Sequence, residues 1–300
     1  MWSGIVETFC YAPGMASKPK VAIVGAGNLG RALAIALKRA GYVIEVIVSR
    51  RRKSSLREAR VLARRVGARV QTDLRGSEAQ LIWLCVPDAQ ISSAASRLAG
   101  TLRNGKGTIV LHSSGALTSD ELYSFRERGV SAASVHPLMT FVREANPALA
   151  GVSFAIEGDS GAVRAARRCV IDLGGRPYSI RERGKAAYHA WGAFASPLLT
   201  SLLAASERVA AMAGVDRMAA RRRMMPILLQ TLSNYASFGA AGAFSGPIIR
   251  GDVETVGKHL KVLEGQPAAR DVYVALARSA LQYLPAKQKT ALKKLLGGRR

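Results

Sequence analysis

Cysteine is scarce in this chain of 300 residues, and the three that occur, Cys10, Cys85 and Cys169, lie far apart. They form no Cys-x-x-Cys pair, so the sequence excludes a cysteine-based zinc site and offers no disulfide framework, and we expect no metal site. This usage favours the reducing cytoplasm as the protein's location. The first 15 residues lack a basic start and contain Glu7, so we interpret residues 1–17 as an N-terminal extension and not as a secretory signal.

Carboxylates are also few: 20 Asp and Glu residues stand against 44 Lys and Arg residues, which gives a formal net charge of +24. An excess of this size is typical of proteins that bind nucleic acid. Here, however, the arginines are scattered over every segment, and no zinc finger or RNA-recognition signature accompanies them. We therefore interpret the charge as a general property that attracts anionic small ligands, and we keep nucleic-acid binding as a distant third function.

Charge is missing altogether between positions 186 and 206, a stretch long enough to cross a bilayer. It contains His189, Pro197 and many small residues, and it follows a complete set of sheet-forming segments. We therefore predict a buried core helix at this position and no membrane partner.

Apolar runs alternate with helical patterns through the first 180 residues. The expected strands are 20–24, 43–49, 81–86, 107–112, 132–136, 152–157 and 176–180. The expected helices between them are 28–40, 54–66, 91–99, 119–128 and 162–173. Most of the strands are continuous apolar runs, which indicates a sheet covered on both faces. The pattern predicts an α/β domain over residues 18–182, with the doubly wound parallel sheet of the Rossmann class.

Strand signals disappear after residue 183, and long helical runs follow at 185–213, 216–238, 252–263 and 267–284. Gly-Pro and Gly-Gln-Pro breaks separate the later runs. The sequence therefore predicts a second, all-helical domain over residues 183–300.

Gly25, Gly27 and Gly30 form a Gly-x-Gly-x-x-Gly pattern between the first expected strand and the first expected helix. In a dinucleotide site the first glycine permits a tight turn, the second lets the backbone approach the pyrophosphate, and the third lets helix and strand pack closely. The start of the helix, at Asn28 and Leu29, would offer unpaired N–H groups to the phosphates. The segment predicts a dinucleotide site, with a ligand-free glycine turn as the alternative.

No acid follows the second expected strand, where a carboxylate would bond the ribose 2′-hydroxyl of NAD. Ser49, Arg50, Arg51 and Arg52 occupy this position instead. A guanidinium stabilises a 2′-phosphate, which a carboxylate would repel. We therefore predict NADP(H) as the cofactor, contacted chiefly by Ser49 and Arg50, with Arg51 close by. The alternative is a solvated loop before the next helix.

Polar residues follow three later strands, at the edge where open parallel sheets bind their ligands. The segments are Cys85-Val86-Pro87-Asp88, His112-Ser113-Ser114-Gly115 and Val135-His136-Pro137. We assign Val86 and Pro87 to the cofactor. We assign His112, Ser113 and Ser114 to the substrate. Two of only four histidines in the chain lie at these strand ends, which favours a site over a structural role.

Lys185, His189, Gly192 and Ser196 recur at the spacing of one helix face at the start of the helical domain. This face combines a cation and an imidazole with two small residues, so it could supply proton donors and leave room for a ligand. An equally good interpretation is a core helix that uses Gly192 and Ser196 for close packing.

Four segments, HSSGAL, SVHPLMTF, KAAYHAWGAFAS and SGPIIRGDVETVGKHL, together resemble a bacterial family over residues 18–285. That family pairs a Rossmann-like NADP-oxidoreductase domain with a C-terminal domain of unknown function, number 2520, and it is similar in plan to the 6-phosphogluconate dehydrogenase-like group. The resemblance implies a helical domain that forms a homodimer and closes the substrate cleft.

Two further resemblances concern the candidate catalytic residues. HPLMTF is similar to a segment of prephenate dehydrogenases, which implies that His136 contacts substrate or acts as an acid or base. Lys185 and His189 resemble the lysine and asparagine pair of the hydroxyisobutyrate enzymes. Pro197 departs from the family, where the resemblance implies asparagine; proline removes an N–H and should kink the helix, at a cost of ~3 kcal/mol.

These observations predict an NADP(H)-dependent oxidoreductase that acts on a small carbonyl, imine or hydroxy substrate in the cleft between the two domains. His136, Lys185 and His189 are its candidate catalytic residues, and Ser196 joins the substrate-binding set. The alternative is a non-catalytic NADP-binding sensor or scaffold protein, which Pro197 and the high charge favour.

Overall fold

The computed structural model describes residues 18–143, 145 and 147–297. It consists of two compact units that part between Gly192 and Ala193. The sequence pattern places the change of domain at residues 182/183, whereas the first turns of the following helix belong to the N-terminal unit, because Lys185 and Tyr188 are buried there. The expected N-terminal extension, residues 1–17, lies outside the described residues.

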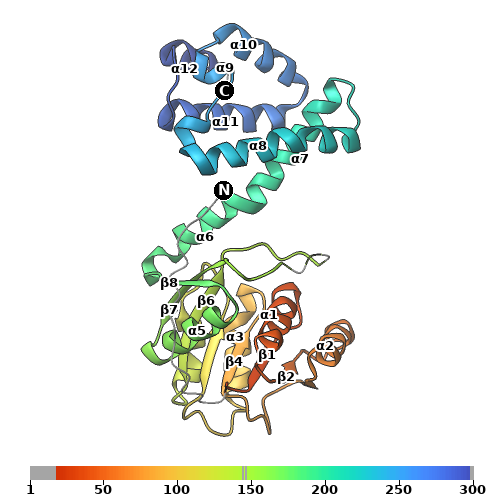
Figure 1. Cartoon of the computed structure of the whole chain (residues 1–300), viewed down its shortest axis with the longest axis vertical. Coiled ribbons are helices and arrows are strands. Elements are labelled where there is room, and N and C mark those ends of the chain that lie inside the picture. Colours follow the sequence, from red (N-terminus) through yellow and green to blue (C-terminus); the bar gives the residue numbers. More distant parts are fainter. Residues whose placement is uncertain (1–17, 144, 146, 298–300) are drawn as a thin grey trace. The chain divides into compact units, whose positions relative to one another are not determined.

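The N-terminal unit contains an eight-stranded sheet in the order β3-β2-β1-β4-β5-β6-β7-β8 (Figure 1). Its strands are β1 Val21–Val24, β2 Ile44–Val48, β3 Arg69–Gln71, β4 Leu81–Leu84, β5 Ile109–His112, β6 Ser131–Pro137, β7 Ser153–Gly158 and β8 Arg176–Ser179. Neighbouring strands are parallel except β6 and β7, which are antiparallel. The prediction of a Rossmann-class sheet is confirmed. The expectation that all its strands are parallel is wrong for β6 and β7. A parallel crossover usually needs a helix, and the described residues between β6 and β7 form none.

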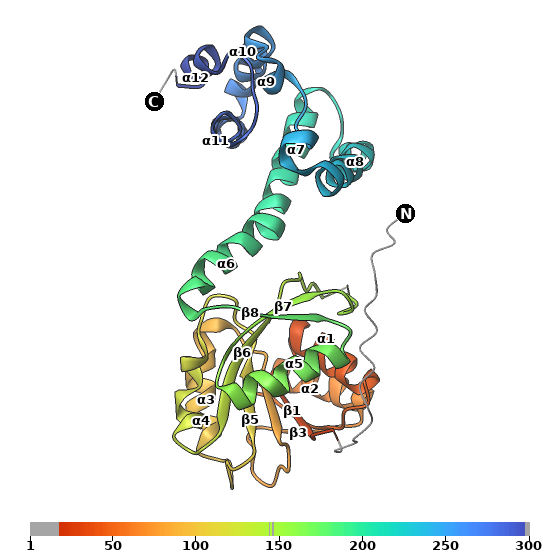
Figure 2. The ribbon, with the colours of Figure 1, turned by 60° about the vertical axis from the view of Figure 1, so that its left-hand side comes forward.

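Helices cover both faces of this sheet, which explains its continuous apolar strands (Figure 2). The elements α1 Asn28–Arg39, α2 Lys53–Val66 and α5 Ser160–Asp172 pack on one face, and α3 Ile91–Ala99 and α4 Tyr123–Arg126 pack on the other. Successive residues of β1 alternate between the two layers: Val21 and Ile23 pack with α1, α2 and α5, whereas Ala22 and Val24 pack with α3 and α4. The two layers fix the strands and bring the carboxyl ends of the parallel ones to one edge.

The C-terminal unit is all-helical, as predicted. Its helices are α7 Leu199–Met212, α8 Arg217–Ala243, α9 Pro247–Arg250, α10 Val253–Val262, α11 Pro267–Tyr283 and α12 Lys289–Gly297. Its core consists of Val256, Leu260, Ala277, Leu281, Leu292 and Leu296. Helices α9 and α12 were not predicted: α9 is a single turn after a Gly-Pro break, and α12 is a short basic segment. The buried Glu207 joins α7 to α8 through ion pairs of 2.7 Å with Arg217 and 3.0 Å with Arg221.

Helix α6 (Lys185–Ala193) continues through a π-helical turn at Phe194–Leu198 into α7. Pro197 lies inside this wider turn, which accommodates a residue without an N–H donor, so the helix changes its bonding instead of ending there. The predicted buried core helix is wrong, because Trp191 is 56% and Phe194 is 70% exposed. Among the described residues no single helix has the length and apolarity to span a membrane, although two segments that meet at a sharp bend, Glu182–Met212 and Arg217–Arg250, satisfy both conditions together.

Candidate functional site

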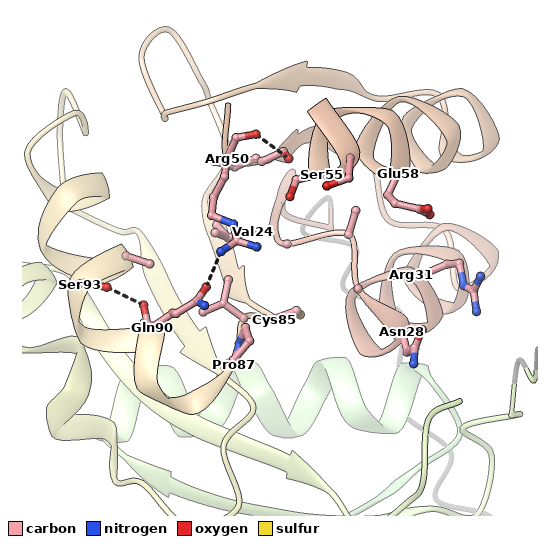
Figure 3. Close-up of a pocket in the computed structure, with 18 of the residues that line it drawn as sticks. Val24, Asn28, Arg31, Arg50, Ser55, Glu58, Cys85, Pro87, Gln90 and Ser93 are labelled. Carbon is pink, nitrogen blue, oxygen red and sulfur yellow. Dashed lines mark hydrogen bonds between the residues drawn. The ribbon is translucent and has the colours of Figure 1, made fainter. Parts of the chain in front are cut away.

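A groove of about 720 Å³ lies at the carboxyl ends of β1, β2 and β4, where the strand order changes direction (Figure 3). Its walls include Gly25, Gly27, Asn28, Arg31, Ser49, Arg50, Ser55, Glu58, Val86, Pro87, Gln90, Arg97 and Arg143. Open α/β sheets bind their ligands at this kind of switch point. Most of the predicted cofactor residues therefore line one cavity. Leu29 packs on the core and Gly30 is buried, so neither of them lines the groove.

The three glycines differ in what surrounds them. Gly25 has φ +102° and turns the chain after β1, and a Cβ there would collide with the carbonyl of Cys85. A Cβ on Gly30 would collide with the carbonyl of Gly25, so this glycine allows α1 to pack against the turn. A Cβ on Gly27 would meet nothing within 4 Å, which leaves open space beside the N-terminus of α1. The first turn of α1 contains no acidic residue, so its N–H groups and dipole are available to an anion.

The residues after β2 form the end of the groove that carries positive charge. Ser49 is buried and its N–H donates to the carbonyl of Gln71 at 2.9 Å, which fixes the loop against β3. The exposed Arg50 side chain points into the groove and donates to Oε1 of Gln90 at 3.3 Å (Figure 3). Arg51 does not line the groove but an adjoining hollow, which Ser49, Arg50 and Arg97 also line.

The segment after β6 closes the opposite wall. Asn28 Nδ2 donates to the carbonyl of Phe141 at 3.1 Å, and the Arg31 guanidinium donates to the carbonyl of Arg143. Arg143 in turn forms an ion pair of 2.6 Å with Glu58 on α2. These contacts tie the glycine loop to the chain that follows His136. They also pair Glu58, the one carboxylate among the described residues that line the groove, with a guanidinium.

His136 lies near the end of β6 in a cluster of rings. Its Nδ1 is 2.8 Å from the hydroxyl of Tyr188, and its ring centroid is 6.1 Å from that of His189. A Cβ on Gly115 would meet His136 Nε2 at 2.9 Å and His189 Cδ2 at 2.7 Å, so glycine is required where this loop passes the two rings. Burial, assisted by the charges of His189 and Lys185, lowers the pKa of His136 to about 4. The structure thus brings together the two predicted catalytic histidines.

His112 is not free to bind a substrate. It is fully buried, its Nε2 lies 2.9 Å from the carbonyl of Thr118, and its Nδ1 accepts from the N–H of Ser114 at 3.1 Å. With both ring nitrogens engaged, it holds the loop after β5 in shape. Burial lowers the pKa of His112 to about 4, so the ring is neutral at physiological pH. The assignment of His112 to the substrate is corrected to a structural role.

The two serines of the same loop are also engaged. Ser114 donates to Oδ2 of Asp88 at 2.7 Å, and its hydroxyl accepts from the N–H groups of Ala116 and Leu117. Ser113 accepts from Nε1 of Trp83 at 2.8 Å. Ser114 is therefore a structural residue, in place of the predicted substrate contact. Ser113 itself is partly exposed.

Lys185 is the third predicted site residue whose role is corrected. It is 1% exposed, and its Nζ donates to Ser134 Oγ at 2.6 Å and to the Ser114 carbonyl at 3.1 Å. Glu157 lies 3.7 Å from the same Nζ. Burial lowers the pKa of Lys185 and raises the pKa of Glu157. A cation enclosed in this way has no access to a substrate, so Lys185 is a positioning residue that ties α6 to the loop after β5.

Glu157 also accepts from the N–H of Ser119 at 2.8 Å and from its hydroxyl at 2.9 Å. The carboxylate thus fixes the far end of the loop that Lys185 holds at Ser114. Ser196, the last predicted substrate residue, lies in the C-terminal unit on the π-helical turn. Its role stays a prediction.

Sequence reasoning missed several residues of the groove and the cluster. Gln90, Ser93, Ala94 and Arg97 line the groove at the spacing of one helix face. That periodicity could have been read once Val86 and Pro87 were assigned to the cofactor. Tyr188 lies between two predicted residues on α6, and no sequence signal marks it as the partner of His136.

Two protein-family models match successive parts of this chain. Residues 14–137 match the Rossmann-like domain, and residues 152–280 match a domain of unknown function, DUF2520. No curated protein matches the chain. A solved structure from Bacteroides fragilis, provisionally named an NADP oxidoreductase, is similar over 87% of this chain and 97% of its own, with 24% identity and a TM-score of 0.73.

Two imine reductases are similar as well. The one from Pseudomonas sp. has 22% identity and a TM-score of 0.61, covering 89% of this chain and 94% of its own. The one from Myxococcus stipitatus, solved with NADP+, has 18% identity and a TM-score of 0.62, covering 88% and 94%. At these identities the likeness shows a shared fold.

Proposed function

Because this chain belongs to the family that joins a Rossmann-like domain to the domain of unknown function DUF2520, we propose that it is an NADP(H)-dependent oxidoreductase that acts on a small carbonyl, imine or hydroxy compound. One observation carries the proposal. The groove has an open glycine backbone at one end, and at the other it has Ser49 and Arg50 where an NAD-binding protein would carry an acid. The similar folds of a protein named as an NADP oxidoreductase and of an imine reductase solved with NADP+ support it.

The residues of the groove fit this cofactor. The space at Gly27 and the uncapped N-terminus of α1 would hold the pyrophosphate. Ser49 and Arg50 would contact the 2′-phosphate through a hydroxyl and a guanidinium. The pairing of Glu58 with Arg143 reduces the repulsion that a lone carboxylate would exert on the bound anion.

Bound NADPH would supply a hydride, and the chain must supply the accompanying proton. Burial raises the pKa of Tyr188, so its hydroxyl keeps its proton and can donate to Nδ1 of His136. The neutral His136 ring then carries its own proton on Nε2, the atom that faces Gly115 and His189. In this arrangement His136 donates its Nε2 proton to the substrate oxygen or nitrogen, and the exposed His189 returns a proton taken from solvent to Nε2, so that the His136 ring is neutral again.

The test is oxidation of bound NADPH, followed by absorbance, against a panel of small ketones, aldehydes and imines. Hydroxy compounds with NADP+ form the reverse panel. We expect one class to react, and His136→Ala to react slowly with the same class. If NADPH binds tightly and no compound oxidises it, the catalytic proposal fails, and the sensor or scaffold hypothesis takes its place.

We also propose that a second copy of this chain covers the apolar face of α8. Met225, Leu229 and Leu232 lie on one helix face and are 43%, 60% and 56% exposed. Contiguous exposed apolar side chains favour an interface, and a face that pairs with itself gives a twofold dimer. Light scattering should give twice the chain mass for the wild type and the chain mass for Leu229→Glu; a monomeric wild type would contradict the proposal.

A further inference from the structure

A second cavity adjoins the groove. It has a volume of about 420 Å³ and we call it the arginine hollow; it is lined by Ser49, Arg50, Arg51, Thr72, Asp73, Arg75, Arg97 and Thr101. Ser49, Arg50 and Arg97 line both cavities, so the groove continues into the hollow past these three side chains. We propose that the 2′-phosphate of NADP(H) binds in the arginine hollow and that Arg97 is a specificity-determining residue for it. This inference rests on the proposed function.

Arg97 is held in place from outside its own helix. Its Nη1 donates to the carbonyl of Thr72, in the loop after β3, at 2.7 Å. The hydroxyl of Thr101 accepts from the N–H of Leu74 at 3.1 Å and donates to the carbonyl of Leu98 at 2.8 Å, so it ties the same loop to the end of α3. A guanidinium has five N–H donors. Among the described residues only the Thr72 carbonyl accepts a hydrogen bond from the guanidinium of Arg97, which leaves N–H donors for an anion.

The charge of the arginine hollow favours an anion. Among the described residues, four arginines from three separate segments line it against one carboxylate, Asp73. That carboxylate already accepts from the N–H of Arg75 at 3.0 Å. Within the part of the chain that the structure describes, the guanidinium groups of Arg51 and Arg75 have no protein partner. A phosphomonoester is doubly charged near neutral pH and accepts hydrogen bonds from several guanidiniums at once, whereas a 2′-hydroxyl does neither.

The position of the hollow identifies the source of the phosphate. Ser49 directly follows β2, where the adenosine ribose binds in dinucleotide sites, and it lies on the border between groove and hollow. Arg50 on the same border is already engaged with Gln90 at 3.3 Å. A phosphate attached to that ribose would therefore meet Arg97 from α3 as well as the loop after β2.

The experiment compares Arg97→Ala and Arg97→Lys with Arg103→Ala, a matched control that removes an exposed arginine of the neighbouring turn outside both cavities. The probes are 2′,5′-ADP and 5′-AMP, followed by NADPH and NADH, in calorimetric titrations at one salt concentration. Their Kd ratios measure what the 2′-phosphate adds. We expect Arg97→Ala to reduce that ratio about 10- to 100-fold, as for the loss of a charge-assisted hydrogen bond. Arg97→Lys should retain part of the preference, and Arg103→Ala all of it.

The binding of 5′-AMP and NADH to Arg97→Ala should stay within about twofold of wild type, which also shows that the variant is folded. An unchanged ratio in Arg97→Ala, or equal weakening of both members of each pair, would overturn the role of Arg97 but not the proposed binding of NADP(H) by the wild type. A wild type that binds none of the nucleotides, or binds the two members of each pair equally, would overturn the proposed function together with this inference. Inorganic phosphate is the last probe: if it binds as tightly as 2′,5′-ADP, the hollow is a site for free anions and the assignment falls.

Discussion

At the ends of β1 and β2 the chain gathers exposed arginines around an open groove, whereas at the ends of β5 and β6 it encloses imidazoles and a lysine among oxygen atoms. Both regions belong to one sheet edge, yet the Arg50 side chain is exposed to solvent, while burial lowers the pKa of the partly buried His136 ring to about 4. The groove is thus suited to hold an anion, and the ring cluster is suited to handle a proton. At one edge of the same sheet, the degree of burial therefore decides whether the residues at a strand end can bind an anion or transfer a proton.

Removing the buried cation of Lys185 has the largest expected effect on the enclosed region, by which we mean the ends of β5 and β6 with His112, His136 and Lys185. Lys185→Met leaves Glu157 buried without its partner, and we expect the free energy of unfolding to fall by about 3–5 kcal/mol. Urea unfolding measures this loss. The double variant Lys185→Met with Glu157→Gln should recover a large part of it, because no charge remains buried. A loss below about 1 kcal/mol in the single variant would show that the pair does not hold the loop.

Replacing one imidazole separates proton handling from anion binding. His136→Ala should reduce kcat about 100-fold, as for the loss of a general acid, while the Kd for NADPH stays unchanged because His136 does not line the groove. Steady-state kinetics on the reacting compound class measure the first effect, and fluorescence titration measures the second. His259→Ala, which removes a histidine of the C-terminal unit, is the control. If His136→Ala lost turnover and NADPH affinity equally, the groove and the ring cluster would not have separate roles in anion binding and proton transfer.

The buried histidines should make stability depend on pH. The folded-state pKa is about 4 for both His112 and His136, below the ordinary value of 6.5. Above pH 6.5 both rings are neutral whether the chain is folded or not, so their contribution is complete. As the pH falls from 6.5 toward 4, only the unfolded chain takes up the protons, and the free energy of unfolding drops by about 1.4 kcal/mol per pH unit for each histidine.

Urea midpoints between pH 7 and pH 5 measure this slope. His112→Gln keeps a donor for the Thr118 carbonyl but cannot titrate, so its slope should be shallower by the share of one histidine. Comparing the two slopes cancels the contribution of the carboxylates that both proteins share. Identical slopes would mean that His112 takes up protons equally in the folded and the unfolded chain, which would contradict its lowered folded-state pKa.

The groove could be predicted from sequence largely because its determinants are local. Gly25, Gly27 and Gly30 act within one strand–turn–helix unit, and Ser49 and Arg50 follow the next strand directly. Arg97 escaped notice because it lies on α3, which α2, β3 and β4 separate from the loop after β2 in the sequence. Its helix-face spacing was visible, but nothing local pointed that face at the loop after β2.

The ring cluster was predicted less well, for a physical reason. His112 and His136 both end strands and look alike in sequence, but the loop after β5 folds back through the bond between Ser114 and Asp88 and buries His112. Lys185 was rightly placed on the same helix face as His189, yet its partner Glu157 lies on a strand far earlier in the chain. Long-range contacts of this kind leave no periodic signal.

The most direct measurement of the central claim is the Kd for NADPH and for NADH, titrated against wild type, Arg50→Glu and the exposed control Arg60→Glu. We expect wild type and the control to prefer NADPH by about 100-fold, the value of strong charge-assisted contacts to a phosphate, and Arg50→Glu to lose that preference because it repels the 2′-phosphate. Equal affinity of the wild type for the two dinucleotides would contradict it.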